Sequence, residues 1–305
     1  MVSHWDDVEA VDREFGDLRG TWRDLGGAAG SEAVGLQRVE VAPGARSTPV
    51  HVHGDEEEIF FVLGGSGLSW QDGRTFRIAG GDVIVHRICE EEHTLLGGDD
   101  GLDVLMFGER SKTDLAWLPR AQVSWAGPHW LPPGDHPFVR EVAAGPLEAP
   151  APEERRPANI VTLEDVPLEE RRRGDVDQAT RDLGEAAGSV RTGLSYISVS
   201  PGGLSNPPHC HAAEEELFVV LEGDGDLLLD GAAPQPVRAG SVVARPAGTG
   251  IAHAFRAGER GLVLLAFGQR VASDICFYPR SGKLSVRGVK AIFRVQRVDY
   301  WDGEE

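Results

Sequence analysis

Cysteine is scarce in this chain of 305 residues, and basic residues are outnumbered. The three cysteines, Cys89, Cys210 and Cys276, form no C-x-x-C pair and cannot build a disulfide framework. Lys and Arg number 30 against 49 Asp and Glu, so the formal net charge is −19. Duplex nucleic acid and anionic membranes both require clustered cations. We therefore expect neither a nucleic acid nor a membrane as a partner.

Long apolar runs are also missing. No stretch approaches the roughly 18 apolar residues that suggest a transmembrane helix. The N-terminal sequence MVSHWDDVEAVDREFGD has neither the basic start nor the apolar core of a signal peptide. Together these features predict a cytoplasmic protein.

What the sequence does contain is one unit present twice. RDLGGAAGSEAVGL at 23–36 recurs as RDLGEAAGSVRTGL at 181–194, displaced by 158 residues. The displacement then grows by two, and the register continues to the end of each copy. Between the copies lies a segment rich in Pro, Gly and charge. The repeat predicts an N-terminal domain over 1–126, a linker over 127–157 and a C-terminal domain over 158–305.

Each copy is predicted to be all-β. Short β-favouring runs alternate with turn signals, such as IFFVL before GGSG in the first copy and LFVVL before EGDG in the second. Such spacing, without crossover helices, is typical of a closed double-sheet barrel of jelly-roll type. Short helices are a weaker expectation near 10–24 and 168–182.

Histidines and glutamates stand at matched positions in the two copies. His51 and His53 are two residues apart and share one face of a strand. Glu58 opens the next predicted strand, and a turn brings His93 to a strand alongside. Three neutral imidazoles and one carboxylate suit a divalent transition metal, namely Mn, Fe, Co, Ni, Cu or Zn. The second copy rebuilds the set with His209, His211, Glu216 and His253, which predicts one metal ion per domain.

These residues lie in motifs that resemble those of the cupin superfamily. H-x-H-x4-E-x6-G at 51–65 and again at 209–223 is similar to the first cupin motif, and the segments 81–93 and 240–253 resemble the second. The resemblance implies a bicupin, two tandem cupin (double-stranded β-helix) barrels, with the metal ligands on the eight positions above.

The second motif departs from the family pattern. In the first copy Arg87 and Cys89 replace its Pro and Gly, and both copies carry insertions before the last histidine. Either Glu57 or Glu58 fits as the carboxylate of the first domain. Glu58 is favoured because six residues separate it from Gly65, as the motif requires.

The size and double site are similar to those of bicupin flavonol (quercetin) dioxygenases. This resemblance implies a metal-dependent dioxygenase that acts on an aromatic or enediol-like small molecule, with dioxygen as a second substrate. Glu58 and Glu216 would then act as catalytic bases. Six apolar side chains are expected near the metals and suit a planar ring: Phe60, Val62, Leu95, Phe218, Val220 and Phe255.

Two other functions stay open. One is a metal-dependent isomerase or decarboxylase of a sugar or small acid, although the predicted strands offer few Arg and Lys for a polyanionic substrate. The other is a non-catalytic metal or small-ligand binder, like the seed-storage bicupins. Exposed barrel edges would allow a homodimer.

Further residues recur around the predicted ligands. His86 and Arg245 hold equivalent positions and either face substrate or lie on the strand surface. The acidic run Glu90–Glu92 is either a proton relay or a solvated turn. Arg110 with Asp114 and Arg270 with Asp274 recur in both copies and indicate structural ion pairs in preference to an anion site.

Overall fold

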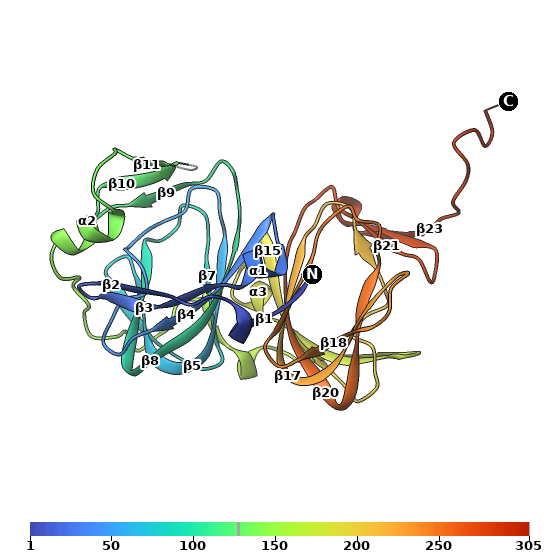
Figure 1. The fold of residues 1–305 in the computed structure, drawn as a ribbon, viewed down its shortest axis with the longest axis horizontal. Helices are drawn as coiled ribbons and strands as arrows, with labels where there is room; N and C mark the ends of the chain where they lie inside the picture. Colours follow the sequence, from blue (N-terminus) through green and yellow to red (C-terminus); the bar gives the residue numbers. More distant parts are fainter. Residues whose placement is uncertain (127–128, 305) are drawn as a thin grey trace.

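Two β-barrels lie side by side in the molecule, one built mainly from each half of the chain (Figure 1). The computed structural model describes residues 1–126 and 129–304; two residues of the predicted linker, 127 and 128, lie outside the described residues. Strands dominate and helices are short. The predicted all-β class with two tandem barrels is confirmed.

The first barrel is an antiparallel sheet of eight strands among the described residues. Their order is β12-β7-β5-β8-β4-β3-β2, with β6 paired to β5. The bounds are β2 Val11–Phe15, β3 Leu18–Asp24, β4 Val34–Val41, β5 Glu58–Gln71, β6 Arg74–Ala79, β7 Asp82–His86, β8 His93–Glu109 and β12 Ile160–Thr162.

The second barrel repeats this topology in its described strands. The order is β1-β19-β17-β20-β15-β14-β13, with β18 paired to β17. The bounds are β1 Val2–His4, β13 Glu169–Arg173, β14 Val176–Asp182, β15 Thr192–Val199, β17 Glu216–Leu229, β18 Gln235–Arg238, β19 Ser241–Arg245 and β20 His253–Gln269.

Each barrel carries a smaller sheet at one end. In the first it is β9 Leu115–Leu118, β10 Val123–Ala126 and β11 His129–Leu131; in the second it is β16 Cys210–His211, β21 Ile275–Tyr278, β22 Lys283–Val286 and β23 Ala291–Arg294. After β23 the chain end extends away from the barrel (Figure 1).

The α-helices are short: α1 Leu25–Ala29, α2 Pro137–Ala143 and α3 Leu183–Ala186. Single 3₁₀ turns span Trp5–Asp7, Leu163–Asp165 and Arg287–Val289. The helices predicted near 10–24 and 168–182 are wrong, because these segments pair as hairpins, β2 with β3 and β13 with β14. No helix in the described ranges is long and apolar enough to cross a membrane.

The two barrels exchange their first strands. β1, at the start of the chain, pairs with β19 of the second barrel, so that Val2 lies opposite Val243. β12, the equivalent strand of the second copy, pairs with β7 of the first barrel, so that Ile160 lies opposite Ile84. Each three-residue strand thus completes a sheet of the other copy, which ties the two halves together. The domain limits 1–126, 127–157 and 158–305 stay a prediction.

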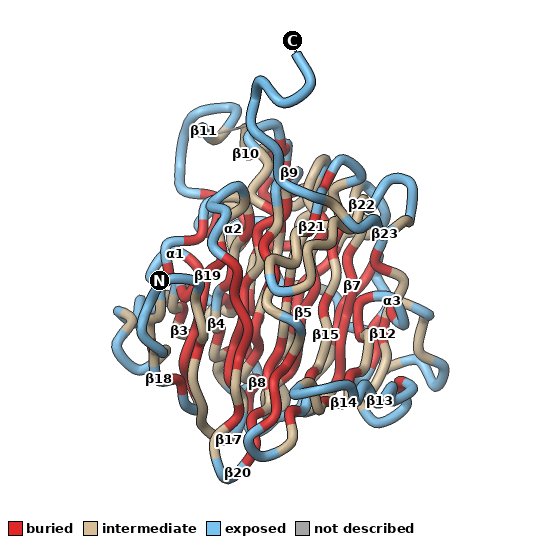
Figure 2. The backbone as a smooth tube through the Cα atoms, turned by 90° about the vertical axis from the view of Figure 1, so that its right-hand side faces the viewer, coloured by how far each residue is buried: buried red, intermediate tan, exposed pale blue. Residues whose placement is uncertain are grey.

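Alternate residues of β5 face two different cores. Ile59 and Phe61 belong to an apolar cluster shared by both barrels, whereas Phe60 belongs to the core inside the first barrel. Figure 2 shows the long strands of both barrels, β5 and β8 in the first and β17 and β20 in the second, as largely buried. Because successive side chains of a strand point to opposite faces, Glu58 shares the interior face with Phe60. Glu57 shares the face that is turned toward the second barrel.

Candidate metal centres

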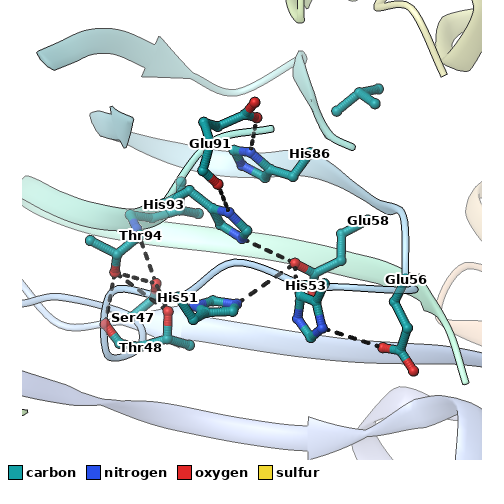
Figure 3. Close-up of polar contacts among 12 residues, drawn as sticks. Ser47, Thr48, His51, His53, Glu56, Glu58, His86, Glu91, His93 and Thr94 are labelled. Carbon is teal, nitrogen blue, oxygen red and sulfur yellow. Dashed lines mark hydrogen bonds and ion pairs between the residues drawn. The ribbon is translucent and has the colours of Figure 1, made fainter. Parts of the chain in front are cut away.

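The three predicted histidine ligands of the first barrel converge on a carboxylate oxygen of the fourth, Glu58 (Figure 3). The Oε2 atom of Glu58 lies 3.7 Å from Nε2 of His51, 3.6 Å from Nε2 of His53 and 3.0 Å from Nε2 of His93. Glu58 begins β5 and His93 begins β8, while a backbone bridge holds His51 opposite His93. The fold therefore brings together residues far apart in the sequence.

The second barrel repeats this arrangement. The Oε2 atom of Glu216 lies 3.9 Å from Nε2 of His209, 3.7 Å from Nε2 of His211 and 3.2 Å from Nε2 of His253. His209 is bridged to His253 as His51 is to His93. All eight predicted ligands thus meet in two matched quartets.

The outer ring nitrogens fix how these imidazoles point. Nδ1 of His51, His93 and His209 lies 2.9–3.2 Å from the backbone carbonyl oxygens of Pro49, Glu91 and Pro207. A ring whose Nδ1–H donates to a carbonyl presents a lone pair at Nε2, which is the form that binds a metal. Nδ1 of His253 is buried without a hydrogen-bond partner among the described residues.

The spacing of the donor atoms fits a metal ion. Ligands about 2.1 Å from an ion stand roughly 3.0 Å apart in octahedral and roughly 3.4 Å apart in tetrahedral geometry. The Nε2–Oε2 distances of 3.0–3.9 Å lie around these values. Three imidazoles and one carboxylate are also the donors that a borderline divalent metal takes.

Asp114 and Asp274 orient the remaining histidines. Oδ2 of Asp114 accepts a hydrogen bond from Nδ1 of His53 at 2.8 Å, and Oδ2 of Asp274 accepts one from Nδ1 of His211 at 2.7 Å. The predicted ion pairs of these aspartates with Arg110 and Arg270 are wrong. Those arginines pair with carboxylates at the α1 and α3 N-termini instead, Arg110 with Asp24 and Arg270 with Asp182.

Glu57 is engaged at the interface between the barrels. Its carboxylate accepts hydrogen bonds from the hydroxyls of Ser189 and Thr192 and from the backbone N–H groups of 190–192, all in the second barrel. Glu215, the equivalent residue, accepts bonds from the N–H groups of 32–34 in the first barrel. Of the two candidates in the first barrel, Glu58 is the one that faces the imidazoles.

Burial and neighbouring charges both shift the pKa values of the quartet residues. Burial and neighbouring imidazoles lower the pKa of His93 to about 3. Burial alone would lower the pKa of His53 also, but the carboxylates of Glu58 and Asp114 raise it to about 9. Burial would raise the pKa of Glu58, yet the surrounding imidazoles hold it well below its usual range. The inward carboxylate is therefore ionised.

The residue opposite the glutamate differs between the barrels. His86 pairs across the strands with Glu58, and its ring stacks on His93 at 3.7 Å between centroids. Its Nδ1 lies 2.7 Å from Glu91, so one glutamate of the acidic turn reaches the site. In the second barrel Arg245 is opposite Glu216 and is buried. The sequence marked this pair of positions but could not tell which way they faced.

Two cavities border the second quartet. One of about 830 Å³ is bordered by His211, Glu216 and Phe218 among others. Another of about 550 Å³ is bordered by His209 and Tyr278. Its lining also includes four cationic side chains, Arg171, Arg172, Arg173 and Lys283. The sequence predicts few Arg and Lys on the strands that carry the ligands; these cations come instead from β13 and β22, and they border the same cavity as His209.

The apolar side chains expected around the metals are members of the barrel cores. Phe60, Val62 and Leu95 pack inside the first barrel, and Phe218, Val220 and Phe255 inside the second. Of these six, Phe218 also borders the larger cavity. Small barrels fill their interior with side chains, so these residues chiefly support the quartets.

Comparison with known proteins agrees with this architecture. The cupin domain family matches residues 37–100 and 195–267, one segment in each barrel, and no curated protein matches the chain. An oxalate decarboxylase of Lactobacillus farciminis, in a formate complex, is similar with a TM-score of 0.61 and 18% identity over 90% of this chain and 87% of that one. Oxalate decarboxylase from Bacillus subtilis at pH 4.6 gives a TM-score of 0.59 and 17% identity over 88% and 75%. At such identities the likeness concerns the fold. A segment of each barrel thus matches the cupin domain family, and both barrels carry the same quartet, so the chain contains two tandem cupin domains, the layout of a bicupin.

Proposed function

We propose that this bicupin is a metal-dependent enzyme that decarboxylates a small carboxylic acid, with the second barrel as the working site. The matching quartets support metal binding in both barrels. The solved structures named above, which are oxalate decarboxylases, support the reaction class by analogy of fold alone. The lining of the second barrel supports the substrate class.

The observation that carries the proposal is the cationic cavity beside His209. Its lining holds three consecutive arginines, Arg171–Arg173, together with Lys283. Arg171 and Arg172 form ion pairs with neighbouring carboxylates (Glu169, Glu170 and Asp177), so among the described residues Arg173 and Lys283 carry the unpaired charge. The whole chain carries a net charge of −19, so such a lining stands out from the rest of the molecule. Cations at a cleft concentrate anions and raise their rate of association. A carboxylate substrate is therefore drawn toward the second quartet.

The roles of the chain's own residues follow from their positions. A bound divalent ion supplies Lewis-acid polarisation of a substrate carboxylate. Lys283 and the β13 arginines attract and orient the anion, and Tyr278, whose ring centroid lies 5.7 Å from that of His209, covers one side of the site. Loss of CO₂ leaves a carbon that must take up a proton. Water supplies that proton. Glu216 is held ionised, as Glu58 is in the first barrel, and has no proton of its own to give; it is our candidate for accepting the proton from water and passing it on.

A dioxygenase acting on an aromatic or enediol-like molecule is the second candidate. Phe218 borders the larger cavity next to His211 and Glu216, where a planar ring could lie against it. The cationic lining of the other cavity has no role in that reaction unless the substrate is also an anion. This ordering reverses the one that the sequence favours.

The test is turnover by protein loaded in turn with Mn, Fe, Co, Ni, Cu or Zn. Substrates are a panel of small mono- and dicarboxylic acids, oxalate among them, and a panel of flavonols and catechols. We expect CO₂ release from an acid without net oxygen uptake. Oxygen uptake with a ring-cleaved product would instead establish the dioxygenase, and tight binding without turnover a non-catalytic binder.

Paired variants assign the reaction to a barrel. His209→Ala/His211→Ala is expected to abolish turnover, and His51→Ala/His53→Ala to leave most of it. Lys283→Ala is expected to raise KM about tenfold through lost attraction for the anion, about 1.4 kcal/mol. Arg77→Ala, on the exposed face of β6, is the matched control and should change nothing. Turnover that survives loss of the second quartet would contradict the assignment.

A further inference from the structure

A cysteine thiol lies beside the second quartet. Cys276 of β21 pairs directly with His211 of β16 in the small antiparallel sheet of the second barrel. Residues directly opposite in such a pair project from the same face, with Cβ atoms about 5 Å apart. Since His211 turns its Nε2 to the quartet, Cys276 faces the same way.

Interatomic distances place the thiol within reach of the same ion. Sγ of Cys276 and a nitrogen from each of His209 and His211 all lie within 4.8 Å of one another. The same two imidazoles form the quartet with Glu216. Cys276 is buried, and a cavity of about 290 Å³ is bordered by the thiol together with His209, His211 and Tyr278.

The first barrel has no sulfur at this position. Val52 is bridged to Trp117, so the residue opposite His53 is Ala116. Ala116 and Cys276 follow Asp114 and Asp274 by two residues in their respective copies. The described quartet of the first barrel therefore offers nitrogen and oxygen donors alone, whereas the second quartet has the sulfur of Cys276 beside it.

We propose that Cys276 is an additional thiolate ligand of the metal ion in the second barrel, which makes that centre chemically distinct from the first. On binding, the metal–sulfur bond forms and the S–H proton passes to water. Thiolate selects softer ions than imidazole and carboxylate do. The second site then favours Zn, Co or Cu(I) over Mn more strongly than the first site does. This inference rests on the metal binding proposed above.

The other two cysteines supply matched controls. Cys210 lies between His209 and His211, and strand alternation turns it away from them; it is buried. Cys89 is exposed in the turn before β8 of the first barrel. Replacing either one removes a thiol from the chain without touching the position opposite His211.

The experiment is the absorption spectrum of the chain loaded with Co(II), with cobalt counted by elemental analysis. We expect two cobalt ions per chain and a near-ultraviolet thiolate-to-cobalt charge-transfer band. Cys276→Ala and Cys276→Ser should lose the band entirely, while Cys210→Ala and Cys89→Ala keep it. His51→Ala/His53→Ala should keep the band with half the cobalt, and Ala116→Cys should increase it up to twofold.

A second measurement needs no variant. X-ray absorption of the zinc-loaded wild-type chain should show a zinc–sulfur distance of about 2.3 Å at half the zinc. Two bound ions with no sulfur contact overturn this inference and leave both metal centres in place. A band that survives in Cys276→Ala overturns it as well. A second barrel that binds no metal overturns it together with the proposed function.

Discussion

The two barrels hold the same quartet in different surroundings. In the first, His86 stacks on His93 and Ala116 is opposite His53. In the second, Arg245 is opposite Glu216, and Cys276 is opposite His211. The shared geometry comes from the scaffold: two strand starts, one backbone bridge and one aspartate on an outer ring nitrogen. The difference teaches that the scaffold fixes the positions of the quartet, while cross-strand neighbours set which other side chains surround it.

The barrels also differ in a buried charge at equivalent positions. Arg46, 2% exposed, binds Glu141 of α2 at 2.7 Å and Asp17 at 2.7 Å. Leu204 is the equivalent residue in the second barrel and is likewise buried. The linker helix α2 therefore docks on the first barrel through a charge that the second barrel lacks.

The largest expected effect comes from making the barrels alike at this position. Arg46→Leu leaves Glu141 buried with Arg120 as its remaining charged partner. We expect the free energy of unfolding to fall by about 3–5 kcal/mol, as when one partner of a buried ion pair is removed. Chemical denaturation measures it, and Arg46→Leu/Glu141→Leu should recover most of the loss. A single variant within about 1 kcal/mol of wild type would contradict the role of this pair.

The two interface carboxylates, Glu57 and Glu215, should differ in how much each contributes to the free energy of unfolding. Glu57 accepts bonds from two hydroxyls and three N–H groups, whereas Glu215 accepts from three N–H groups alone. We expect Glu57→Gln to lower the free energy of unfolding by about 3 kcal/mol and Glu215→Gln by about 2 kcal/mol, because an amide N–H₂ faces donors it cannot pair with. Urea denaturation compares them. An equal or reversed order would show that the bond count does not govern the interface.

The orienting aspartates separate the two centres. Asp114→Asn and Asp274→Asn each leave one acceptor oxygen where the carboxylate has two. If that oxygen keeps the backbone N–H groups, an N–H₂ group faces Nδ1 of the histidine, so metal affinity should fall about 10- to 100-fold in that barrel alone. Calorimetric titration of each variant, with the first and the second quartet disabled in turn, gives the metal affinity of each site separately. Should both centres weaken together, they would be coupled through the interface and not independent.

The smallest expected effect is on the free energy of unfolding at acidic pH. Burial would raise the pKa of Asp17, but its hydrogen bonds and charge pairing with Arg46 lower it. A carboxyl with a depressed folded pKa stabilises the protein above its unfolded pKa of about 3.9, and that stability is lost as pH falls through the folded value. Because Asp17 is 43% exposed, the contribution is under about 1 kcal/mol.

The stability difference between wild type and Asp17→Asn, taken from Tm at pH 7 and pH 3, should therefore shrink in acid. Asp175→Asn, at the equivalent position of the second barrel, is the comparison, because Asp175 pairs with exposed arginines and not with a buried one. A difference that stays constant or grows as pH falls would be contrary to the sign derived for Asp17.

Sequence alone predicts the duplicated fold and the convergence of the quartets, since H-x-H on a strand and a glutamate at the next strand start follow from two-residue periodicity. It does not predict the exchange of β1 and β12, because three-residue strands carry no periodic signal. The partners of Asp114 and Asp274 were missed for a different reason. Recurrence in both copies marks these residues, but the choice between an arginine four positions away and a histidine on another strand depends on tertiary geometry. The sequence does not predict that the arginines of β13 border the cavity beside His209, because EERRR at 169–173 lies far from any ligand motif.

The central claim is that each barrel holds one divalent ion through three Nε2 atoms and one carboxylate. Elemental analysis of metal per chain tests it most directly, in wild type and in the variants His51→Ala/His53→Ala and His209→Ala/His211→Ala. The account predicts two ions in the wild type and one in each double variant. Two ions retained in either variant, or none bound by the wild type after loading, would contradict it.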